Sequence, residues 1–398
     1  MKKIGFVFLF SLFLSSVSFA QYREPEFRII FHSAGFPIRS FFNNGFSNIL
    51  NPLTYNITGT NPAALTHFNR FSAGMSFRYT TKIDSAIPTV GDKIGIGNAN
   101  KAMPQSVGIV LPLRKFRFGM GFRQKYSASL DFGEIPIRTA QNPQGTGETF
   151  SIDFETFVYS ASGILAYSFE NPLFNMHDIS LGFQLDYDYL KESESILKAK
   201  TTAEDWRFNW KIGFLYQINE TAKTAIVYQS SSSFSGTIKQ NAGFITSNPD
   251  TFSNFTPVEV LPRFKGKLPA QLITGYAINI KKGLTFSGIL QVSYWSQVSK
   301  NYRNQIDFSQ NLLFPLSKKI NATLGIYYSD RKYAPLEISY YNRDDKAVFL
   351  LAGVRVKIGN ISIDGLIGDS HLFSSDLRKQ STISIGFSYF GQAIGKRS

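Results

Sequence analysis

Hydrophobic and polar residues alternate along many stretches of this chain. In RFNWKIGFLYQI, residues 207–218, every second residue from Phe208 to Ile218 is apolar, and the residues between them are mostly polar or small. The stretches LGFQLDYDY at 181–189 and TISIGFSYF at 382–390 show the same period of two. Because successive side chains of a β-strand point to opposite faces, this pattern predicts strands with one apolar and one polar face.

The alternating stretches are long and numerous. Many reach about ten residues, which a tilted strand needs to cross a bilayer, whereas strands of soluble sandwiches average about five or six. Trp206, Trp295 and Tyr389 lie near predicted strand ends, where an aromatic girdle would place them. We expect about fourteen membrane strands, at residues 70–81, 104–113, 115–128, 154–169, 178–191, 205–218, 222–236, 268–280, 283–297, 302–315, 319–330, 346–357, 360–369 and 380–390.

The connections between these strands alternate in length. The short ones are residues 113–115, 219–221, 280–283, 316–319 and 358–360, and the longer ones are 82–103, 129–153, 192–204, 237–267, 331–345 and 370–379. The connection near 298–301 departs from the rule, because it should be long and is short. Short periplasmic turns and longer outer loops are typical of bacterial outer-membrane barrels. The sequence therefore predicts an all-β fold, a transmembrane antiparallel β-barrel over residues 70–390, with residues 391–398 as a short periplasmic tail.

The first twenty residues resemble a secretory signal peptide. Lys2 and Lys3 precede an apolar run at 4–17, and Ser18-Phe19-Ala20 has the small-x-small form of a cleavage site. We expect the mature chain to begin at Gln21. No later segment approaches the roughly 20 consecutive apolar residues of a membrane helix.

Composition agrees with an exported barrel. Aromatic residues make up 15% of the chain, with 38 Phe and 19 Tyr, and cysteine is absent. Disulfides and thiolate chemistry are therefore excluded. The formal net charge is +14, or +12 without Lys2 and Lys3. For a protein outside the cytoplasm this favours an anionic membrane surface or anionic ligands as partners, and it does not favour nucleic acid.

Residues 21–69 precede the first predicted strand and show no sustained period. They are too apolar for a solvated tail, with Phe36, Phe41, Phe42 and Phe46 among their aromatic residues. A barrel of about fourteen strands has an interior wide enough for a plug. We expect this segment to fold inside the barrel as an N-terminal plug. Within it, Asn61 and Pro62 suit the cap and the first position of a short helical turn.

Several stretches, taken in order, resemble one family. They are NPAAL at 61–65, MPQSVGIVLPLRKFRFGMGF at 103–122, KLPAQLITGYAINIKKGLTFSGILQVSYWSQ at 267–297 and AVFLLAGVRVKIGNISIDGLIG at 347–368. Together they resemble the FadL/TodX family of outer-membrane transporters for hydrophobic compounds, over most of the mature chain. The resemblance implies a fourteen-stranded barrel, passive uptake of molecules such as long-chain fatty acids, and a hatch in the lumen. Asn61, Pro62 and Ala63 would form the hatch hinge.

The resemblance also implies a lateral exit beside a kink in the third strand. In KFRFGMGFRQKY, Gly119 and Gly121 fall on the inward face and are the candidate kink. Alternatively, these glycines make room for the hatch. Arg117 and Arg123 flank them and are candidates to bind a fatty carboxylate. Phe36, Phe41, Phe42 and Phe46 are candidates for an apolar ligand pocket or for anchoring the hatch to the wall.

Charged residues recur on the predicted inward faces. The set comprises Arg78, Arg117, Arg123, Arg207, Lys211, Arg355, Lys357, Asp186, Asp188 and Asp364. Most of these residues are expected to pair with one another, with hatch carbonyls or with water at the rim.

The sequence offers no enzyme signature. Its four histidines are scattered without metal-ligand spacing, and no cofactor site is expected. Ser370 and His371 are adjacent, but neighbours on an extended chain point to opposite faces. We expect a monomer that contacts outer-membrane lipids and a hydrophobic ligand. Two other functions stay open: a protein-binding scaffold like the related barrel of type IX secretion, and a general porin.

Overall fold

The computed structural model describes most of the barrel and part of the segment before it. The described residues are 26–28, 48–80, 85–88, 93–96, 101–136, 147, 149–169, 178–196, 199–241, 263–281, 283–299, 302–330, 347–374 and 381–393. The expected signal peptide, residues 1–20, lies outside them, as do Phe36, Phe41, Phe42 and Phe46.

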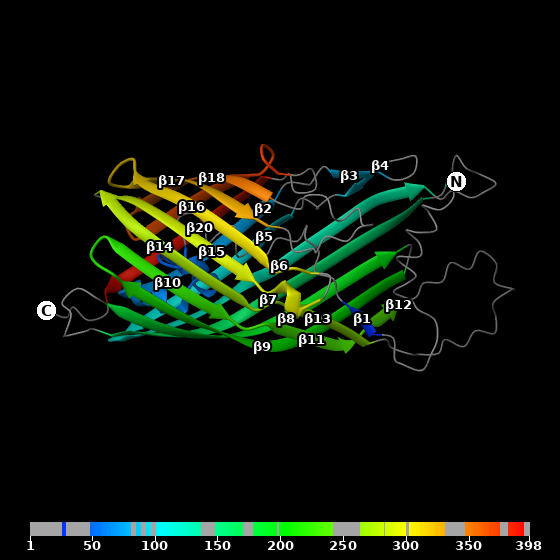
Figure 1. Cartoon of the computed structure of the whole chain (residues 1–398), viewed down its shortest axis with the longest axis horizontal. Coiled ribbons are helices and arrows are strands. Elements are labelled where there is room, and N and C mark those ends of the chain that lie inside the picture. Colours follow the sequence, from blue (N-terminus) through cyan, green and yellow to red (C-terminus); the bar gives the residue numbers. More distant parts are fainter. Residues whose placement is uncertain are drawn as a thin grey trace.

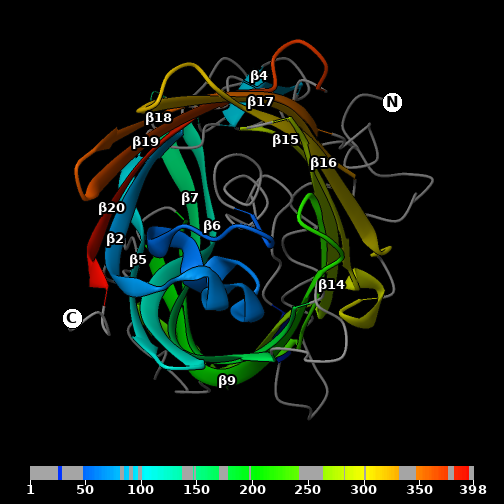
Figure 2. The same cartoon turned by 90° about the vertical axis from the view of Figure 1, so that its left-hand side faces the viewer.

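Fourteen antiparallel strands form the wall of a barrel (Figure 1) and close into a ring (Figure 2). They are β2 (Arg70–Thr80), β5 (Lys101–Leu113), β6 (Phe116–Pro136), β7 (Thr149–Phe169), β8 (Ile179–Ile196), β9 (Ala199–Gln217), β10 (Ala222–Gln229), β14 (Gln271–Lys281), β15 (Leu284–Ser293), β16 (Gln305–Pro315), β17 (Ile320–Ser329), β18 (Ala347–Ile358), β19 (Ile361–Asp369) and β20 (Ser381–Ala393). Each strand pairs with the next, and β20 pairs with β2 to complete the ring. The predicted fold class is confirmed.

In the described part of the chain, six short strands accompany the ring. They are β1 (Glu26–Arg28), β3 (Ser85–Pro88), β4 (Lys93–Ile96), β11 (Ser232–Thr237), β12 (Lys239–Asn241) and β13 (Arg263–Leu268). β3 and β4 pair with each other, β12 pairs with β9, and β13 lies between β1 and β11 in a separate sheet. We call the end of the barrel with the tight turns, such as 114–115 and 359–360, the short-turn end, and the opposite end the long-loop end.

The outer surface of the ring is apolar. Large hydrophobic side chains alternate with buried ones along each strand, and typical exposed residues are Met75, Phe77, Phe118, Met120, Leu181, Phe183, Phe208 and Trp210. Buried residues facing the lumen are largely polar, among them Ser76, Ser162, Gln184, Asn209, Gln291, Asp307 and Ser384. An apolar exterior around a polar interior is the arrangement of a transmembrane barrel. In the described part of the chain, no helix is long and apolar enough to cross a membrane.

The strands differ in length and are interrupted at two breaks. β6 to β9 extend well beyond the predicted 115–128, 154–169, 178–191 and 205–218. The predicted strand 222–236 divides into β10 and β11. The predicted strand 268–280 corresponds to β14 from Gln271 on, and a second break separates it from β13, whose residues 263–267 fall in the predicted long connection 237–267. Pro269 lies at the second break and has no N–H to donate to a ladder. β20 continues to Ala393, so the predicted tail at 391–398 begins inside the strand.

The end of β15 also corrects a prediction. The strand predicted at 283–297 ends at Ser293, and the 3₁₀ helix η3 (Trp295–Gln297) follows. Trp206 and Tyr389 are exposed as a girdle requires, but Trp295 is only 5% exposed. Its indole Nε1 donates to Gln305 Oε1 at 3.0 Å. Trp295 therefore belongs to the interior and not to the girdle.

Residues 48–69 lie inside the ring (Figure 2). We call them the lumen segment. It contains two 3₁₀ helices, η1 (Thr54–Gly59) and η2 (Pro62–His67), whose residues are almost all buried. η1 contacts β2, β5, β6 and β20, and η2 contacts β6 to β9. The part of the predicted plug between 29 and 47 lies outside the described residues.

Candidate functional site

Inward-facing glycines of the wall lie directly beneath the lumen segment. A Cβ atom added at Gly213 would stand 1.8 Å from Asn61 Oδ1, and one at Gly182 would stand 2.2 Å from the Ala63 nitrogen. The other glycines with such contacts are Gly74, Gly108, Gly119, Gly121, Gly275 and Gly386. These distances are too short for real side chains. The glycines therefore allow the lumen segment to approach the backbone of the wall.

Buried polar side chains of β8 and β9 hold the backbone of the lumen segment. Lys211 Nζ donates to the carbonyl oxygens of Thr58 at 2.8 Å and Thr60 at 3.3 Å. Gln184 Nε2 also donates to the Thr58 carbonyl, at 3.0 Å. Both side chains are fully buried. The end of η1 can stay buried in the lumen because the wall satisfies its free carbonyl groups.

Asn61 has the capping role that the sequence predicts. Its Oδ1 accepts from the Ala63 nitrogen at 2.9 Å, and Pro62 begins η2. Its Nδ2 donates to the Phe214 carbonyl of β9 at 3.0 Å. Asn61 thus starts the helical turn and attaches it to the wall with one side chain.

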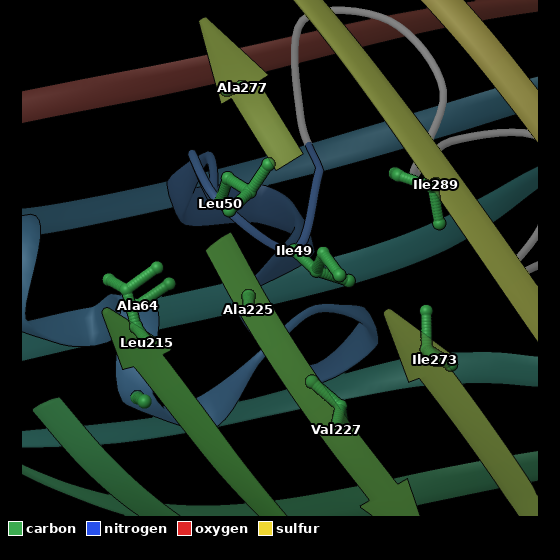
Figure 3. Packing of buried hydrophobic residues seen from close by; sticks show 10 residues of the cluster. Ile49, Leu50, Ala64, Leu215, Ala225, Val227, Ile273, Ala277 and Ile289 are labelled. Atoms are coloured by element: carbon green, nitrogen blue, oxygen red, sulfur yellow. The ribbon is translucent and has the colours of Figure 1, made fainter. Parts of the chain in front are cut away.

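An apolar cluster also holds the lumen segment (Figure 3). Ile49, Leu50 and Ala64 pack against inward residues of β9, β10, β14 and β15, which are Leu215, Ala225, Val227, Ile273, Ala277 and Ile289. Lys223 Nζ donates to the Leu50 carbonyl at 3.1 Å and to Asn51 Oδ1. The lumen segment is therefore held by apolar packing as well as by hydrogen bonds.

Arg117 lies at the short-turn end and bonds to the chain itself. Its Nε donates to the Phe68 carbonyl at 2.5 Å, and its Nη2 donates to Asn69 Oδ1 at 3.0 Å. Its Nη1 donates to the Phe116 carbonyl at 3.0 Å. Arg117, a predicted ligand residue, therefore lies apart from Arg123. Its hydrogen bonds join the lumen segment to the first residues of β6.

Arg123 belongs to a buried cluster of charges near the middle of the barrel. Arg123 Nη2 lies 3.5 Å from Asp186 Oδ2, and Lys125 Nζ lies 3.5 Å from the same oxygen. With Lys211, the cluster has three cations against two carboxylates, those of Asp186 and Asp188, and all five are nearly or fully buried. The Nε and Nη2 of Arg123 form no hydrogen bond, although Nη2 is ion-paired with Asp186, and Asp186 Oδ2 and Asp188 Oδ1 also accept none. The cluster has one cation more than it has carboxylates, and an anion would neutralise this excess.

Asp188 connects three strands at the edge of this cluster. Its Oδ2 lies 2.6 Å from each of Lys125 Nζ, Asn209 Nδ2 and Ser232 Oγ, all of which donate to it. These donors come from β6, β9 and the start of β11. Sequence periodicity placed Asp188 on the inward face but gave no indication of this set of partners.

The ladder between β5 and β6 ends early. Its last pair is Ser106–Arg123, although β5 continues to pair with β2 as far as Lys101, and β6 continues to pair with β7 as far as Pro136. Residues 124–136 of β6 and 101–105 of β5 therefore have a ladder on one side only among the described strands. Above this point, no backbone hydrogen bond joins the described residues of β5 to those of β6.

A β-bulge accompanies the end of this ladder. The β6–β7 register shifts between Gln124 and Tyr126, which leaves Lys125 as the extra residue. Gly119 and Gly121, the candidate kink, are instead paired regularly with β5 and β7 and contact Leu65 and Thr58 of the lumen segment. The three consecutive polar residues at 123–125 break the alternation, and this is the sequence signal that could have located the bulge.

An apolar cluster lies inside the long-loop half, which we call the upper cluster. Its buried members are Tyr126, Val158, Leu190, Ala203, Phe234, Ile238, Phe264, Leu268 and Trp295. Tyr302, in the connection after η3, packs edge-on against Trp295, with the two ring centroids 5.7 Å apart. Burial raises the pKa of Tyr302 to about 12. The phenol is therefore neutral, and the cluster offers an uncharged surface next to the Arg123 cluster.

The Ser370–His371 pair shows no catalytic geometry. Ser370 is fully buried, whereas His371 Nδ1 lies 2.9 Å from Asp369 Oδ2 on the exposed side. Of the long connection predicted at 237–267, residues 242–262 lie outside the described part.

No protein-family model matches the chain, and no curated protein sequence matches it. Solved structures do match. The toluene transporter TbuX of Ralstonia pickettii gives a TM-score of 0.62 at 15% identity, over 91% of this chain and 100% of that chain. A FadL homologue of Pseudomonas aeruginosa gives 0.54 at 12%, over 86% and 95%. The toluene transporter TodX of Pseudomonas putida gives 0.56 at 11%, over 91% and 98%. The chain thus has the fold of FadL-type outer-membrane barrels, as the sequence resemblance implies.

Proposed function

We propose that this FadL-type barrel is an outer-membrane protein for the passive uptake of hydrophobic or amphipathic small molecules, with long-chain fatty acids as the first candidates. The observation that carries the proposal is the early end of the β5–β6 ladder at Ser106–Arg123, directly above a lumen filled by residues 48–69. The lumen segment obstructs the direct route along the barrel axis. The unladdered wall offers a route into the membrane instead.

The proposed path uses surfaces that suit an amphipathic molecule. A ligand that enters at the long-loop end meets the upper cluster, where Phe234, Phe264 and Trp295 would contact its apolar part. Arg123, with its unused donors, would bind a carboxylate. The ligand then leaves sideways between β5 and β6, and the lumen segment acts as a hatch with Asn61, Pro62 and Ala63 as its hinge.

The structural neighbours support this class of substrate. TbuX and TodX are described as toluene transporters and CymD as a monoaromatic hydrocarbon channel. The charge cluster around Arg123 favours an amphipathic acid over a neutral hydrocarbon for this chain, because a buried positive excess is stabilised by an anion.

The direct test is uptake in a strain that lacks the protein. The deletion strain is complemented with the wild type or with the Gln105→Cys/Gln124→Cys variant, whose cysteines would join β5 to β6 just above their last ladder pair. We expect oleate uptake with the wild type, less uptake with the oxidised variant, and recovery after reduction. Unchanged uptake in the deletion strain would refute the proposal. A stable protein partner in pull-downs would then indicate a scaffold, and a large ion conductance would indicate a porin.

A further inference from the structure

A second interruption occurs in the wall, beside β9. β9 pairs with β10 as far as Lys211–Gln229 and with β12 from Thr202–Lys239 onward. Just beyond the end of the β9–β10 ladder, one more backbone hydrogen bond runs from the Ser230 nitrogen to the Trp210 carbonyl. β11 lies alongside β9 here but forms its ladder with β13. We call this stretch, residues 203–209 against 231–238, the seam.

Side chains take the place of backbone pairing in the seam. The Ser235 nitrogen donates to Asp205 Oδ2 at 2.7 Å, and Arg207 Nη2 donates to the Ser235 carbonyl at 3.2 Å and to its Oγ at 2.9 Å. Arg207 Nε and Asp205 Oδ2 form an ion pair at 2.8 Å. The two side chains therefore satisfy the peptide groups of Ser235 that a neighbouring strand would otherwise satisfy. We call these contacts the clip.

Apolar surfaces lie on both sides of the seam. On the outer side, Trp206 is 49% exposed and Phe208 is 67% exposed, and Trp206 stacks on Tyr189 in the girdle. On the inner side, Ala203 and Phe234 belong to the upper cluster. The seam thus separates the lipid-facing surface from the apolar interior by the thickness of one wall.

The chemistry of the clip makes this wall easier to separate than a ladder. A continuous ladder over the seam would have to break several backbone bonds together, and each exposed peptide group is costly to leave unsatisfied in lipid. The clip consists of contacts to a single residue, and Arg207 is 42% exposed, so water can replace its bonds. One further side-chain bond, from Asn209 Nδ2 to Ser232 Oγ, joins β9 to β11 at the lower end of the seam. Asp205 and Arg207 remain paired with each other when β11 moves away.

We propose that the seam is a second lateral exit, through which apolar molecules leave the upper cluster for the membrane between β9 and β11. It is distinct from the β5–β6 interruption, from which β7 and β8 separate it. The nature of its cargo rests on the proposed function, but the opening of the seam itself does not. The clip is the part of the wall that decides whether this exit is open.

The absence of cysteine makes a covalent test straightforward. In Asp205→Cys/Ser235→Cys, oxidation places a disulfide across the seam, and reduction leaves of the clip only the bond from Arg207 Nη2 to the carbonyl of residue 235. The matched control is Phe214→Cys/Ile226→Cys, which joins partners already paired in the β9–β10 ladder. Proteoliposomes are assayed for transfer of radiolabelled toluene to the lipid phase. We expect the reduced seam variant to exceed the wild type, the oxidised one to fall below it, and the control to stay unchanged on oxidation. Equal transfer by the oxidised and reduced seam variants would overturn the proposal.

A distance measurement tests the opening without any transport. Nitroxide labels at Phe208→Cys and Ser233→Cys, both exposed, lie on the two sides of the seam. Pulsed electron paramagnetic resonance should show two label-to-label distances, a short one for the closed seam and a longer one for the open seam. Arg207→Ala should increase the fraction of molecules with the longer distance. A single short distance in both proteins would contradict the proposal. If the wild type transfers no toluene or oleate, the proposed function fails, and these distances still decide whether the seam opens.

Discussion

The two halves of this barrel are built in opposite ways. In the short-turn half, every described pair of neighbouring strands is joined by a ladder, and glycines bring the lumen segment against the wall. In the long-loop half, the ladders between β5 and β6 and beside β9 stop, and the interior contains the upper cluster of buried apolar residues. In the proposed function, the lumen segment closes the axial route at one end, and the interrupted ladders weaken the wall at the other. Lateral passage requires both properties together.

The largest effect on this contrast is expected when a wall glycine beneath the lumen segment is replaced by a bulky residue. Gly213→Leu places a side chain where Asn61 and Pro62 now lie, so the lumen segment must leave the wall. We expect a barrel that is closed to ions to show open-channel currents in planar bilayers. Gly163→Leu is the control, because a Cβ there meets nothing within 4 Å. Closed channels in both variants would mean that the lumen segment does not block the axis.

The next largest effect is expected at Asp188, between the two halves. Asp188→Asn removes the charge that faces Lys125 and weakens the bonds from Asn209 and Ser232. Loss of one partner of a buried ion pair costs about 3 kcal/mol. We expect faster hydrogen exchange in β11 and near the bulge at Lys125, with little change in β16 to β19. The exposed Asp178→Asn is the control, and uniform exchange changes over the whole barrel would contradict a local role.

Lys211 tests the polar attachment of the lumen segment alone. Lys211→Met keeps most of the side chain but leaves the carbonyl groups of Thr58 and Thr60 with fewer donors. A buried carbonyl without a partner costs about 1–3 kcal/mol. Brief openings in single-channel records are expected, together with a lower Tm. Lys357→Met, at an exposed position, should have neither effect. A Lys211→Met channel as quiet as the wild type would show that apolar packing suffices.

The smallest effect is expected at the cap of η2. Asn61→Ala removes the bond to Ala63 and the bond to Phe214. The loss of such a cap costs about 1 kcal/mol, so Tm should fall slightly while the channel stays closed. Asn279→Ala, which loses only an exposed bond to Thr285, gives the baseline. A fall in Tm no larger than this baseline would show that the cap contributes nothing.

Much of the short-turn half could be predicted from the sequence. The period of two located the strands and their inward faces, and Asn61-Pro62 located the start of η2. These features are local, because a strand face or a cap depends on residues a few positions apart. Gly119 and Gly121 were placed correctly on the inward face, where they make room for the lumen segment, which was one of the two interpretations.

The long-loop half, where the ladders are interrupted, was harder to predict. Where a ladder stops depends on the register between strands that are distant in sequence, and periodicity does not contain the register. Trp295 illustrates this, because an aromatic residue near a strand end suits a girdle and an interior equally well. The runs RQK at 123–125 and SSSS at 230–233 break the alternation, and each marks an interruption in the structure.

The most direct measurement compares ion current and uptake in one preparation of the wild-type barrel. Planar bilayers report flow along the axis, and proteoliposomes from the same sample report transfer of oleate and toluene into the lipid phase. Passage through the wall predicts transfer of the hydrophobic compounds with no ion current above the protein-free membrane. Transfer that occurs only in samples that also conduct ions would place the route along the axis and contradict lateral passage.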